Sequence, residues 1–91
     1  MEPLTRQDVL DVLTDEECLL ADGFEAALVG YVQQFNRTTA LYDYEACIKV
    51  LVDGGMDEEE AAEYFDFNVA GAYVGEKTPS FAFLVKEPPD A

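Results

Sequence analysis

The feature that most constrains the fold is a regular apolar pattern from Tyr44 to Val52. Apolar side chains recur there at positions i, i+3, i+4, i+7 and i+8, which places them on one face of an α-helix. Asp43 stands directly before the pattern, where a carboxylate can cap the free amides of the first turn. Asp53-Gly54-Gly55 follows it and predicts a turn. The segment therefore predicts an amphipathic helix that packs one face against a core.

A further helix is predicted to begin after Asp57. Asp57 and Glu60 have the spacing of a capping box, in which each side chain can satisfy a free backbone amide of the other. The carboxylates of Glu58-Glu59-Glu60 lie at the end of the helix that carries partial positive charge. We expect this helix to run to about Val69 and to stop at Gly71.

Two segments rich in β-branched and aromatic residues, 27–32 and 38–42, predict the strands of a hairpin that turns at Asn36-Arg37. A helix over residues 24–35 is the alternative, because the segment contains good helix formers, but Gly30 in its middle disfavours it. Residues 80–85 follow two turn signals and predict a final strand.

The N-terminal 21 residues contain two helix-start signals. Thr5 followed by Asp8 can cap a helix whose apolar side chains lie opposite the acidic ones. Thr14 and Glu17 have the spacing of a capping box and predict a second short helix that ends near Ala21. One bent helix over both segments is the alternative.

This order of elements predicts an α+β fold, with a small antiparallel sheet of about three strands packed with three to four short helices. The length of 91 residues fits a single domain over residues 1–91, and a hydrophobic content of 49% is sufficient for a core. We expect residues 87–91 to form a flexible tail.

The chemistry is restricted by the absence of histidine. Without histidine the chain lacks the usual general base near neutral pH and any Ser-His or Cys-His nucleophile, so we expect no enzyme activity, no metal and no cofactor. Cys18 and Cys47 lie in apolar sequence and are expected to be buried free thiols. We see no leader and no membrane-spanning apolar run, and therefore expect a cytoplasmic protein.

The acidic residues are concentrated in two segments. The chain has 20 acidic and 5 basic side chains, for a net charge of −15. Residues 1–26 and residues 51–66 each have a net charge of −7, whereas residues 27–50 are neutral. Such a field repels nucleic acid and anionic lipid and attracts basic protein surfaces.

The second acidic segment presents a stripe of carboxylates. At about 100° per residue, Glu59, Glu63 and Asp66 fall within one narrow stripe, and Glu60 lies beside it. Phe67 falls between Glu63 and Glu60, and an aromatic ring among carboxylates is typical of an interface anchor. The alternative is that the helix distorts near Asp66 and the ring packs inward.

Carboxylates one helical turn apart are separated by roughly 6 Å, which is comparable with the phosphate spacing of a nucleic-acid strand. Two such rows could therefore imitate a nucleic-acid backbone, and Asp8, Asp11 and Asp15 form the second row. The alternative is that the acidic faces are simply solvated and keep a small protein soluble.

Residues 40–48, 56–69, 71–76 and 78–81 resemble a family of short acidic proteins found in bacteriophage and bacterial genomes. The most distinctive part runs from Met56 to Val69. The resemblance implies a phage or mobile-element origin, and no catalytic or binding residue is transferred from it. Small acidic phage proteins are often inhibitors of host enzymes that handle nucleic acid, which favours the mimicry hypothesis.

The sequence thus predicts a non-enzymatic protein that occupies a basic surface of a host nucleic-acid-binding complex, as an inhibitor of the anti-CRISPR or anti-restriction type. The alternative is a small structural or regulatory module that binds through its neutral hairpin and the aromatic side chains of Tyr31, Phe35 and Tyr42. A free strand edge would also allow two copies to pair as a homodimer.

Overall fold

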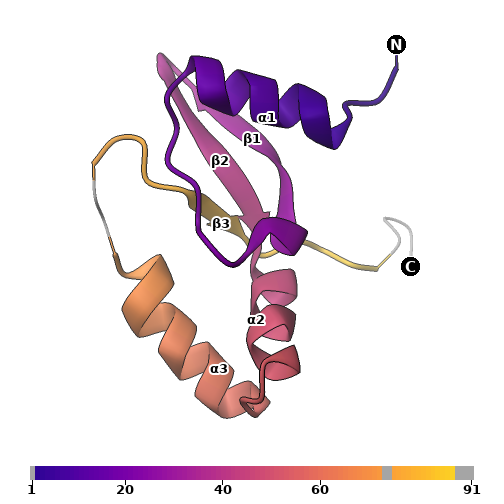
Figure 1. The fold of residues 1–91 in the computed structure, drawn as a ribbon, viewed down its shortest axis with the longest axis vertical. Coiled ribbons are helices and arrows are strands. Elements are labelled where there is room, and N and C mark those ends of the chain that lie inside the picture. The colour runs from indigo at the N-terminus through magenta and orange to yellow at the C-terminus, as the bar shows by residue number, and fades with distance from the viewer. Residues whose placement is uncertain (1, 73–74, 88–91) are drawn as a thin grey trace.

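The computed structural model describes residues 2–72 and 75–87. It confirms an α+β fold in which a three-stranded sheet lies between helices at the two ends of the molecule (Figure 1). The elements in chain order are α1 (Arg6–Asp15), the 3-10 turn η1 (Glu25–Ala27), β1 (Leu28–Gln34), β2 (Arg37–Asp43), α2 (Tyr44–Asp53), α3 (Glu58–Phe65), the π-helical turn η2 (Asp66–Ala70) and β3 (Ser80–Ala82).

The predicted hairpin is formed by β1 and β2, which pair antiparallel from Leu28 opposite Tyr42 to Gln34 opposite Arg37. The turn consists of Phe35 and Asn36, one residue earlier than predicted. The helix considered as an alternative for residues 24–35 does not form. The central strand β2 is covered on both faces, since the consecutive residues Thr38, Thr39 and Ala40 are all buried, whereas Arg37 beside the hairpin tip is exposed.

The prediction of an entirely antiparallel sheet is wrong, because β3 pairs parallel with β2. Leu41 lies opposite Ser80, and Asp43 lies opposite Ala82. After β2 the chain passes through α2 and α3 before it reaches β3. A crossover connection of this length brings the chain back to the end of the sheet where β2 begins, and such connections join parallel strands. The sheet order is β1-β2-β3.

Helix α1 begins as predicted. The Asp8 backbone N–H donates to Thr5 Oγ1 at 3.1 Å, and the Thr5 N–H donates to Asp8 Oδ2 at 3.0 Å, which completes a capping box. Val9 and Leu13 are buried in the core. The helix therefore has one apolar face and an exposed acidic face.

The predicted second N-terminal helix, over residues 14–21, does not form. Thr14 belongs to α1, and its carbonyl accepts from the Glu17 N–H instead of starting a new helix. Glu17 has a φ of 56°, a left-handed conformation that ends the helix. Beyond it, tertiary hydrogen bonds replace helical ones, because the Leu19 N–H donates to the Lys77 carbonyl at 3.2 Å.

Asp43 and Asp57 cap α2 and α3 as predicted, but of the capping box predicted for Asp57 and Glu60 only the bond accepted by Asp57 is present among the described residues. Asp43 Oδ1 accepts from the Glu45 N–H at 3.2 Å, and Asp57 Oδ1 accepts from the Glu60 N–H at 2.8 Å. The glycines after Asp53 end α2, and Gly55 has a φ of 117°, which favours glycine.

The helical run after Asp57 extends to Ala70, one residue beyond the predicted end, but its last five residues form the π-helical turn η2. Gly71 follows this turn, and its backbone lies close to the carbonyl of Asp66. A Cβ atom at position 71 would lie 2.8 Å from the Asp66 carbonyl oxygen, so the turn needs glycine for its close backbone approach. The Asn68 side chain donates to the Tyr64 carbonyl at 3.1 Å, which satisfies a carbonyl at the change of helical register.

Phe65 is the centre of the core. Its fully buried ring makes edge-to-face contacts with Phe24, Tyr44 and Phe81, at centroid separations of 5.7, 5.3 and 4.9 Å. One cluster of buried residues joins α1, the sheet, α2 and α3. The helices and the sheet therefore hold one another in fixed positions.

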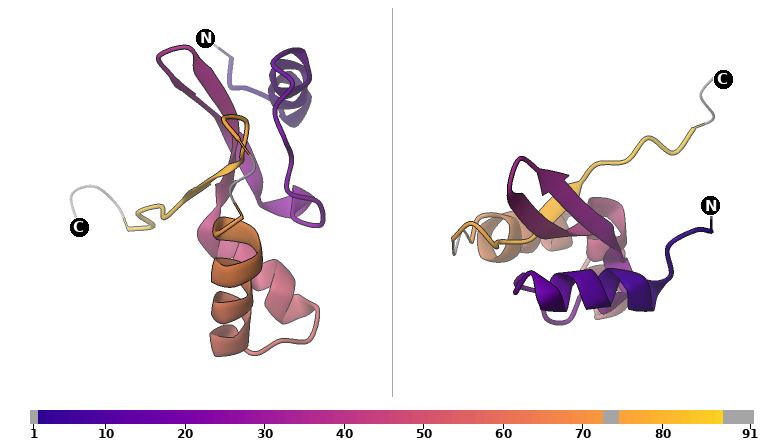
Figure 2. Two further views of the ribbon diagram at one scale, coloured as in Figure 1. Left: turned by 90° about the vertical axis from the view of Figure 1, so that its left-hand side faces the viewer. Right: turned by 90° about the horizontal axis from the view of Figure 1, so that it is seen from above.

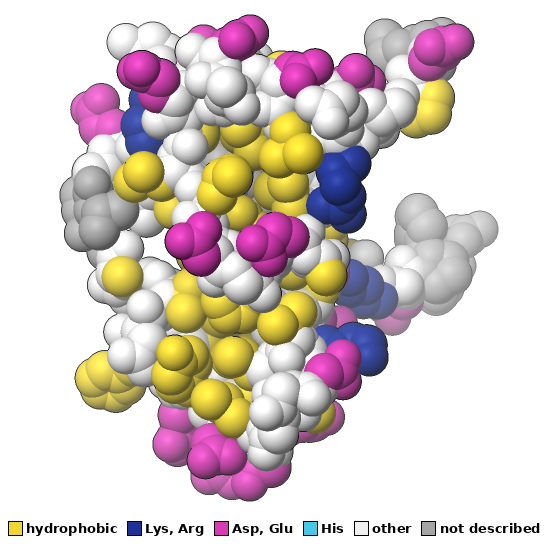
Figure 3. Space-filling view, in the orientation of Figure 1, with side chains coloured by type: hydrophobic (Ala, Val, Ile, Leu, Met, Phe, Trp, Pro, Cys, Tyr) yellow, Lys and Arg dark blue, Asp and Glu magenta, His cyan; other side chains and the backbone are white. Residues whose placement is uncertain are grey.

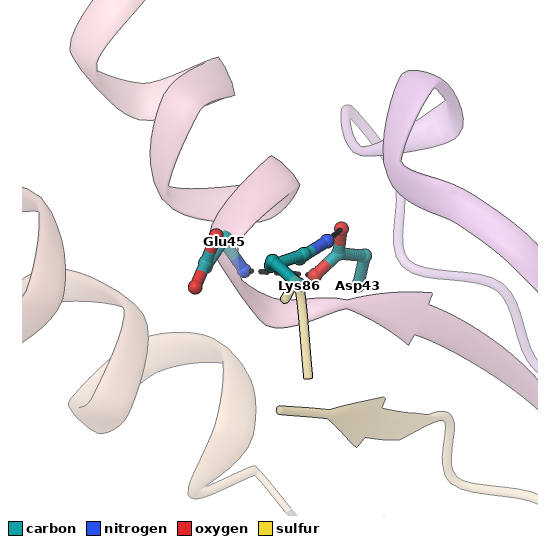
Figure 4. A network of polar contacts seen from close by, with 3 residues as sticks. All are labelled: Asp43, Glu45 and Lys86. Carbon is teal, nitrogen blue, oxygen red and sulfur yellow. Dashed lines mark hydrogen bonds and ion pairs between the residues drawn. The ribbon is translucent and has the colours of Figure 1, made fainter. Parts of the chain in front are cut away.

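Strand β3 is shorter than the predicted strand over residues 80–85, because only Ser80–Ala82 pair with β2. The next residues leave the sheet, and Phe83 stacks on Tyr44 with a centroid separation of 4.2 Å. Lys86 Nζ lies 2.8 Å from Asp43 Oδ2 (Figure 4). The Asp43 carboxylate therefore both caps α2 and forms an ion pair with the segment that follows β3. Residues 88–91 of the predicted tail lie outside the described residues.

Candidate acidic interaction surfaces

The exposed side of α3 carries a hollow surrounded by four carboxylates. Asp57, Glu59, Glu60 and Glu63 line an open hollow of about 290 Å³, and all four side chains are exposed. We call this the α3 acidic surface. Three of its members were predicted as site residues. Asp57 was predicted only as a cap, although its position one turn before the stripe already indicated that it belongs to the same surface.

Packing of α3 explains why these carboxylates face solvent. Ala61 and Phe65 have no exposed surface, so one side of the helix is fixed against the core. The acidic residues at the other positions of the helical repeat must then point outward. The net charge of this surface is uncompensated, because its lining contains no lysine or arginine.

Asp66 and Phe67 lie at the end of α3, beyond the hollow. Asp66 is exposed but does not line the α3 acidic surface. Burial raises the pKa of the Tyr44 hydroxyl, and the nearby charge of Asp66 raises it further. Asp66 therefore lies toward Tyr44, so the structure separates it from the carboxylates that the sequence grouped with it.

Phe67 has 87% of its surface exposed. The sequence offered two interpretations for this ring, exposure among carboxylates or a helix distortion that turns it inward. The helix does distort, since Asp66 begins the π-helical turn, but the ring stays in solvent. The prediction of an inward-facing Phe67 is wrong because the π-helical turn bends the backbone without directing this side chain into the core.

The second predicted row, Asp8, Asp11 and Asp15, lies on the exposed face of α1. Asp8 belongs to the capping box, and Asp11 accepts a hydrogen bond from Gln7 Nε2 at 2.9 Å. Asp15 ends the helix and is followed by two further acidic residues, with no basic residue in the last turn. Carboxylates at this end lie beside the partial negative charge of the helix dipole, which is unfavourable.

The two acidic regions lie at opposite ends of the molecule. Helices α1 and α3 are separated along the longest axis in Figure 1 and in the left view of Figure 2. In the space-filling view, acidic side chains gather at both ends of the face, and the area between them is mainly apolar with two acidic side chains near its centre (Figure 3). The longest dimension of the chain is 38 Å, so a partner that contacts both rows must extend across the molecule.

None of the eight predicted site residues belongs to an ion pair in the described part of the chain. The ion pairs found there are Lys49 with Asp53 at 3.5 Å and Lys86 with Asp43 at 2.8 Å. Both use acidic residues outside the predicted set. The predicted carboxylates are therefore exposed and without a lysine or arginine partner among residues 2–72 and 75–87.

The hairpin that formed the alternative site is divided between core and solvent. Phe35, at the tip, is fully exposed, and Tyr31 is half-buried. Tyr42 has only 2% of its surface exposed, and its hydroxyl accepts from the Ala21 N–H at 2.9 Å. The prediction of Tyr42 as a contact residue is wrong, because its side of β2 faces the core.

The two cysteines are free thiols. Cys47 is fully buried as predicted, whereas Cys18 is half-buried and its Sγ donates to the Thr38 carbonyl at 3.2 Å. Burial raises the pKa of the Cys47 thiol to about 11, so it is a poor nucleophile at neutral pH. Within residues 2–72 and 75–87, no three side chains that could ligate a metal converge, and no helix is long and apolar enough to cross a membrane.

Comparison with protein-family models, with curated proteins and with solved structures finds no match for this chain.

Proposed function

We propose that this chain is a non-enzymatic binding protein that occupies a basic surface of a nucleic-acid-binding complex and competes with nucleic acid for it. The observation that carries the proposal is the exposure of Phe67 directly after a helix with exposed, unpaired carboxylates. Unpaired carboxylates attract a basic surface over long range, and an exposed aromatic ring supplies the apolar contact that dominates affinity at short range.

The dimensions of the molecule suit this role. The acidic rows lie at the two ends of a chain whose longest dimension is 38 Å. One turn of B-DNA spans about 34 Å, so a molecule of this length is long enough for its two acidic ends to face phosphate sites up to about one helical turn apart. Inhibitors of restriction or CRISPR effector complexes are a class in which such competition is effective, and a phage origin would be consistent with it.

Solubility alone is a weaker explanation of the charge. A net charge of magnitude about 2 to 8 is sufficient to keep a small domain soluble, and this chain has −15. In addition, the acidic residues at the end of α1 oppose the helix dipole and so reduce stability. Charge that exceeds the needs of solubility and acts against stability is better explained by recognition of a basic partner.

The test is a pull-down from host lysate followed by competition between nucleic acid and this chain for the captured complex. We expect nucleic acid to release the chain, and salt to weaken the association. A complex that binds nucleic acid normally with this chain attached would show that mimicry is wrong.

The matched variants carry three charge reversals each. Glu59, Glu60 and Glu63 to Lys, three members of the α3 acidic surface, should weaken association at least tenfold and reduce its salt dependence. The control reverses three acidic residues outside both acidic segments and changes the net charge equally: Glu45, Glu76 and Glu87 to Lys. If both variants lose the same affinity, only the net charge matters and the α3 acidic surface is not the site.

A second candidate function is binding through the hairpin tip. Phe35 is fully exposed and has a φ of 58°, a left-handed conformation that is unfavourable for a bulky residue by about 1 kcal/mol. A large apolar side chain that is both exposed and strained is typical of a contact residue. Association that resists salt but is lost in Phe35→Asn would favour this candidate over mimicry.

A further inference from the structure

An apolar groove lies between the segment that follows α1 and the turn that follows α3. It has a volume of about 310 Å³. We call it the leucine groove, after the two exposed leucines on its rim. The residues that define it are Leu19, Leu20, Phe24, Val69, Pro79 and Phe81.

The leucines of this groove are held in an exposed position by hydrogen bonds on either side. The Leu19 N–H donates to the Lys77 carbonyl at 3.2 Å, and the Ala21 N–H donates to the Tyr42 hydroxyl at 2.9 Å. The side chains of Leu19 and Leu20 remain 43% and 48% exposed. The groove is therefore formed before any partner arrives, which reduces the entropy lost on binding.

The volume of the groove indicates the size of its occupant. A closed apolar cavity of about 150 Å³ holds a benzene ring, so an open groove of about 310 Å³ can receive about two large apolar side chains. Occupation by two side chains of one segment is typical of an amphipathic peptide that binds in a groove.

The charge around the groove indicates the sign of the occupant. Asp22 is the charged residue among those that line the groove, and Glu25 and Asp22 both lie near the Tyr42 hydroxyl, to which the Ala21 N–H of the groove donates. The acidic rows of α1 and α3 lie beyond its two ends. A second copy of this chain, with its charge of −15, would be repelled, whereas a segment with lysine or arginine beside its apolar residues matches both the groove and its surroundings.

We propose that the leucine groove binds a basic amphipathic segment of the partner, with about two large apolar side chains in the groove and lysine or arginine side chains toward Asp22 and the acidic ends. The inference rests on the proposed function in that the partner is basic. It adds that recognition requires apolar side chains of the partner, which a nucleic-acid backbone does not supply.

The test uses two synthetic peptides of equal length and net charge. In one peptide, leucine recurs every three to four residues so that it forms one face of a helix, and lysine forms the opposite face. The other peptide has serine in place of each leucine. We expect the full chain to bind the leucine peptide at least tenfold more tightly in titration calorimetry, with amide shifts at Leu19, Leu20 and Val69 in NMR spectra. Equal affinity for the two peptides, or no binding of either, would overturn the proposal.

The matched variants are Leu20→Ser and Leu4→Ser. Both leucines are exposed, so both variants should fold, which circular dichroism can verify. Leu20→Ser should weaken binding of the leucine peptide about tenfold, and Leu4→Ser, outside the groove, should leave it unchanged. Equal loss in both variants would contradict the proposal, as would a dimer of the unmodified chain that Leu20→Ser dissociates in sedimentation experiments.

Failure of this inference is distinguishable from failure of the proposed function. Mimicry is tested by nucleic-acid competition and by charge reversal on α3, neither of which alters Leu19 or Leu20. Release of the chain by nucleic acid together with equal affinity for the two peptides would keep the proposed function and reject the groove.

Discussion

The two acidic ends of the molecule have the same net charge and opposite relations to helix stability. At α3 the acidic run Glu58-Glu59-Glu60 follows the Asp57 cap and lies at the positive end of the helix dipole. At α1 the acidic run continues through Asp15 at the negative end, without a basic residue in the last turn. The carboxylates of α3 therefore stabilise their own helix, whereas the last carboxylates of α1 destabilise theirs.

The ends also differ in apolar exposure. The exposed apolar side chain beside α3 is the aromatic ring of Phe67, whereas the one beside α1 is the aliphatic Leu4. An acidic surface with an aromatic ring can form a specific contact, and one without a ring mainly supplies long-range attraction. Equal charge therefore does not mean an equal role, and α3 is the better candidate for the specific contact.

Two phenylalanines near the end of α3, Phe65 and Phe67, should differ most in their contribution to the free energy of unfolding. Phe65→Ala should lower the free energy of unfolding by about 3 to 5 kcal/mol, because it removes the centre of the aromatic core. Phe67→Ala should change it by less than about 0.5 kcal/mol and should instead weaken partner binding. Urea unfolding measures both. A large destabilisation in Phe67→Ala would show that this ring is structural.

Alkaline pH tests the core between the two acidic ends, because it titrates the buried Cys47 thiol. Carboxyl groups ordinarily ionise at about pH 4, so the charge of the two ends does not change at alkaline pH. The pKa of Cys47 rises from 9.0 to about 11 on folding because the thiol is buried. The unfolded chain therefore loses this proton first, and stability should be full below about pH 9 and fall toward about pH 11. Denaturation midpoints over this range measure the fall, which should be smaller in Cys47→Ala.

The π-helical turn that follows α3 can be broken at Gly71. Gly71→Ala should lower the free energy of unfolding by about 1 to 3 kcal/mol, because its Cβ would lie 2.8 Å from the Asp66 carbonyl oxygen. Gly30→Ala is the control, since a Cβ there meets no atom within 4 Å. Thermal unfolding compares the two. Equal stability of both variants would mean that the turn adjusts easily and does not fix Phe67.

Small changes in the free energy of unfolding should show whether the carboxylates of α1 and α3 interact with their helix dipoles in opposite ways. Glu59→Gln should lower the free energy of unfolding by about 0.3 to 1 kcal/mol, and Asp15→Asn should raise it by a similar amount. Each change removes one negative charge, so a net-charge effect would have the same sign in both. Opposite signs at low salt, both reduced at high salt, would establish the difference between the two helices.

Much of the fold was predictable because it depends on neighbouring residues. The Thr5 and Asp57 caps, the α2 stripe and the hairpin all follow from side chains within a few positions of one another. The exposed carboxylates of α3 were predictable for the same reason, since helical spacing and the burial of Ala61 and Phe65 define the opposite face.

Other features were not predictable from local patterns. The capping box predicted at Thr14 does not form, because α1 continues through Thr14. The backbone N–H groups of the next segment donate hydrogen bonds to the Lys77 carbonyl and the Tyr42 hydroxyl instead. The leucine groove was missed for this reason, since a helix over residues 14–21 would have placed Leu19 and Leu20 on a helix face. The parallel pairing of β3 was missed because strand direction depends on the path of the chain through two helices.

Spacing along the chain was sufficient to predict α1, α2 and α3, the hairpin and the two blocks of negative charge, although it also predicted a helix over residues 14–21 that does not form. Only the tertiary structure decided that the blocks lie at opposite ends, that Tyr42 is buried, that Phe67 stays exposed beyond a distorted turn, and that two leucines border a groove. The physical reason is that each of these depends on contacts between residues far apart in the sequence, and such contacts form only when the chain packs around Phe65.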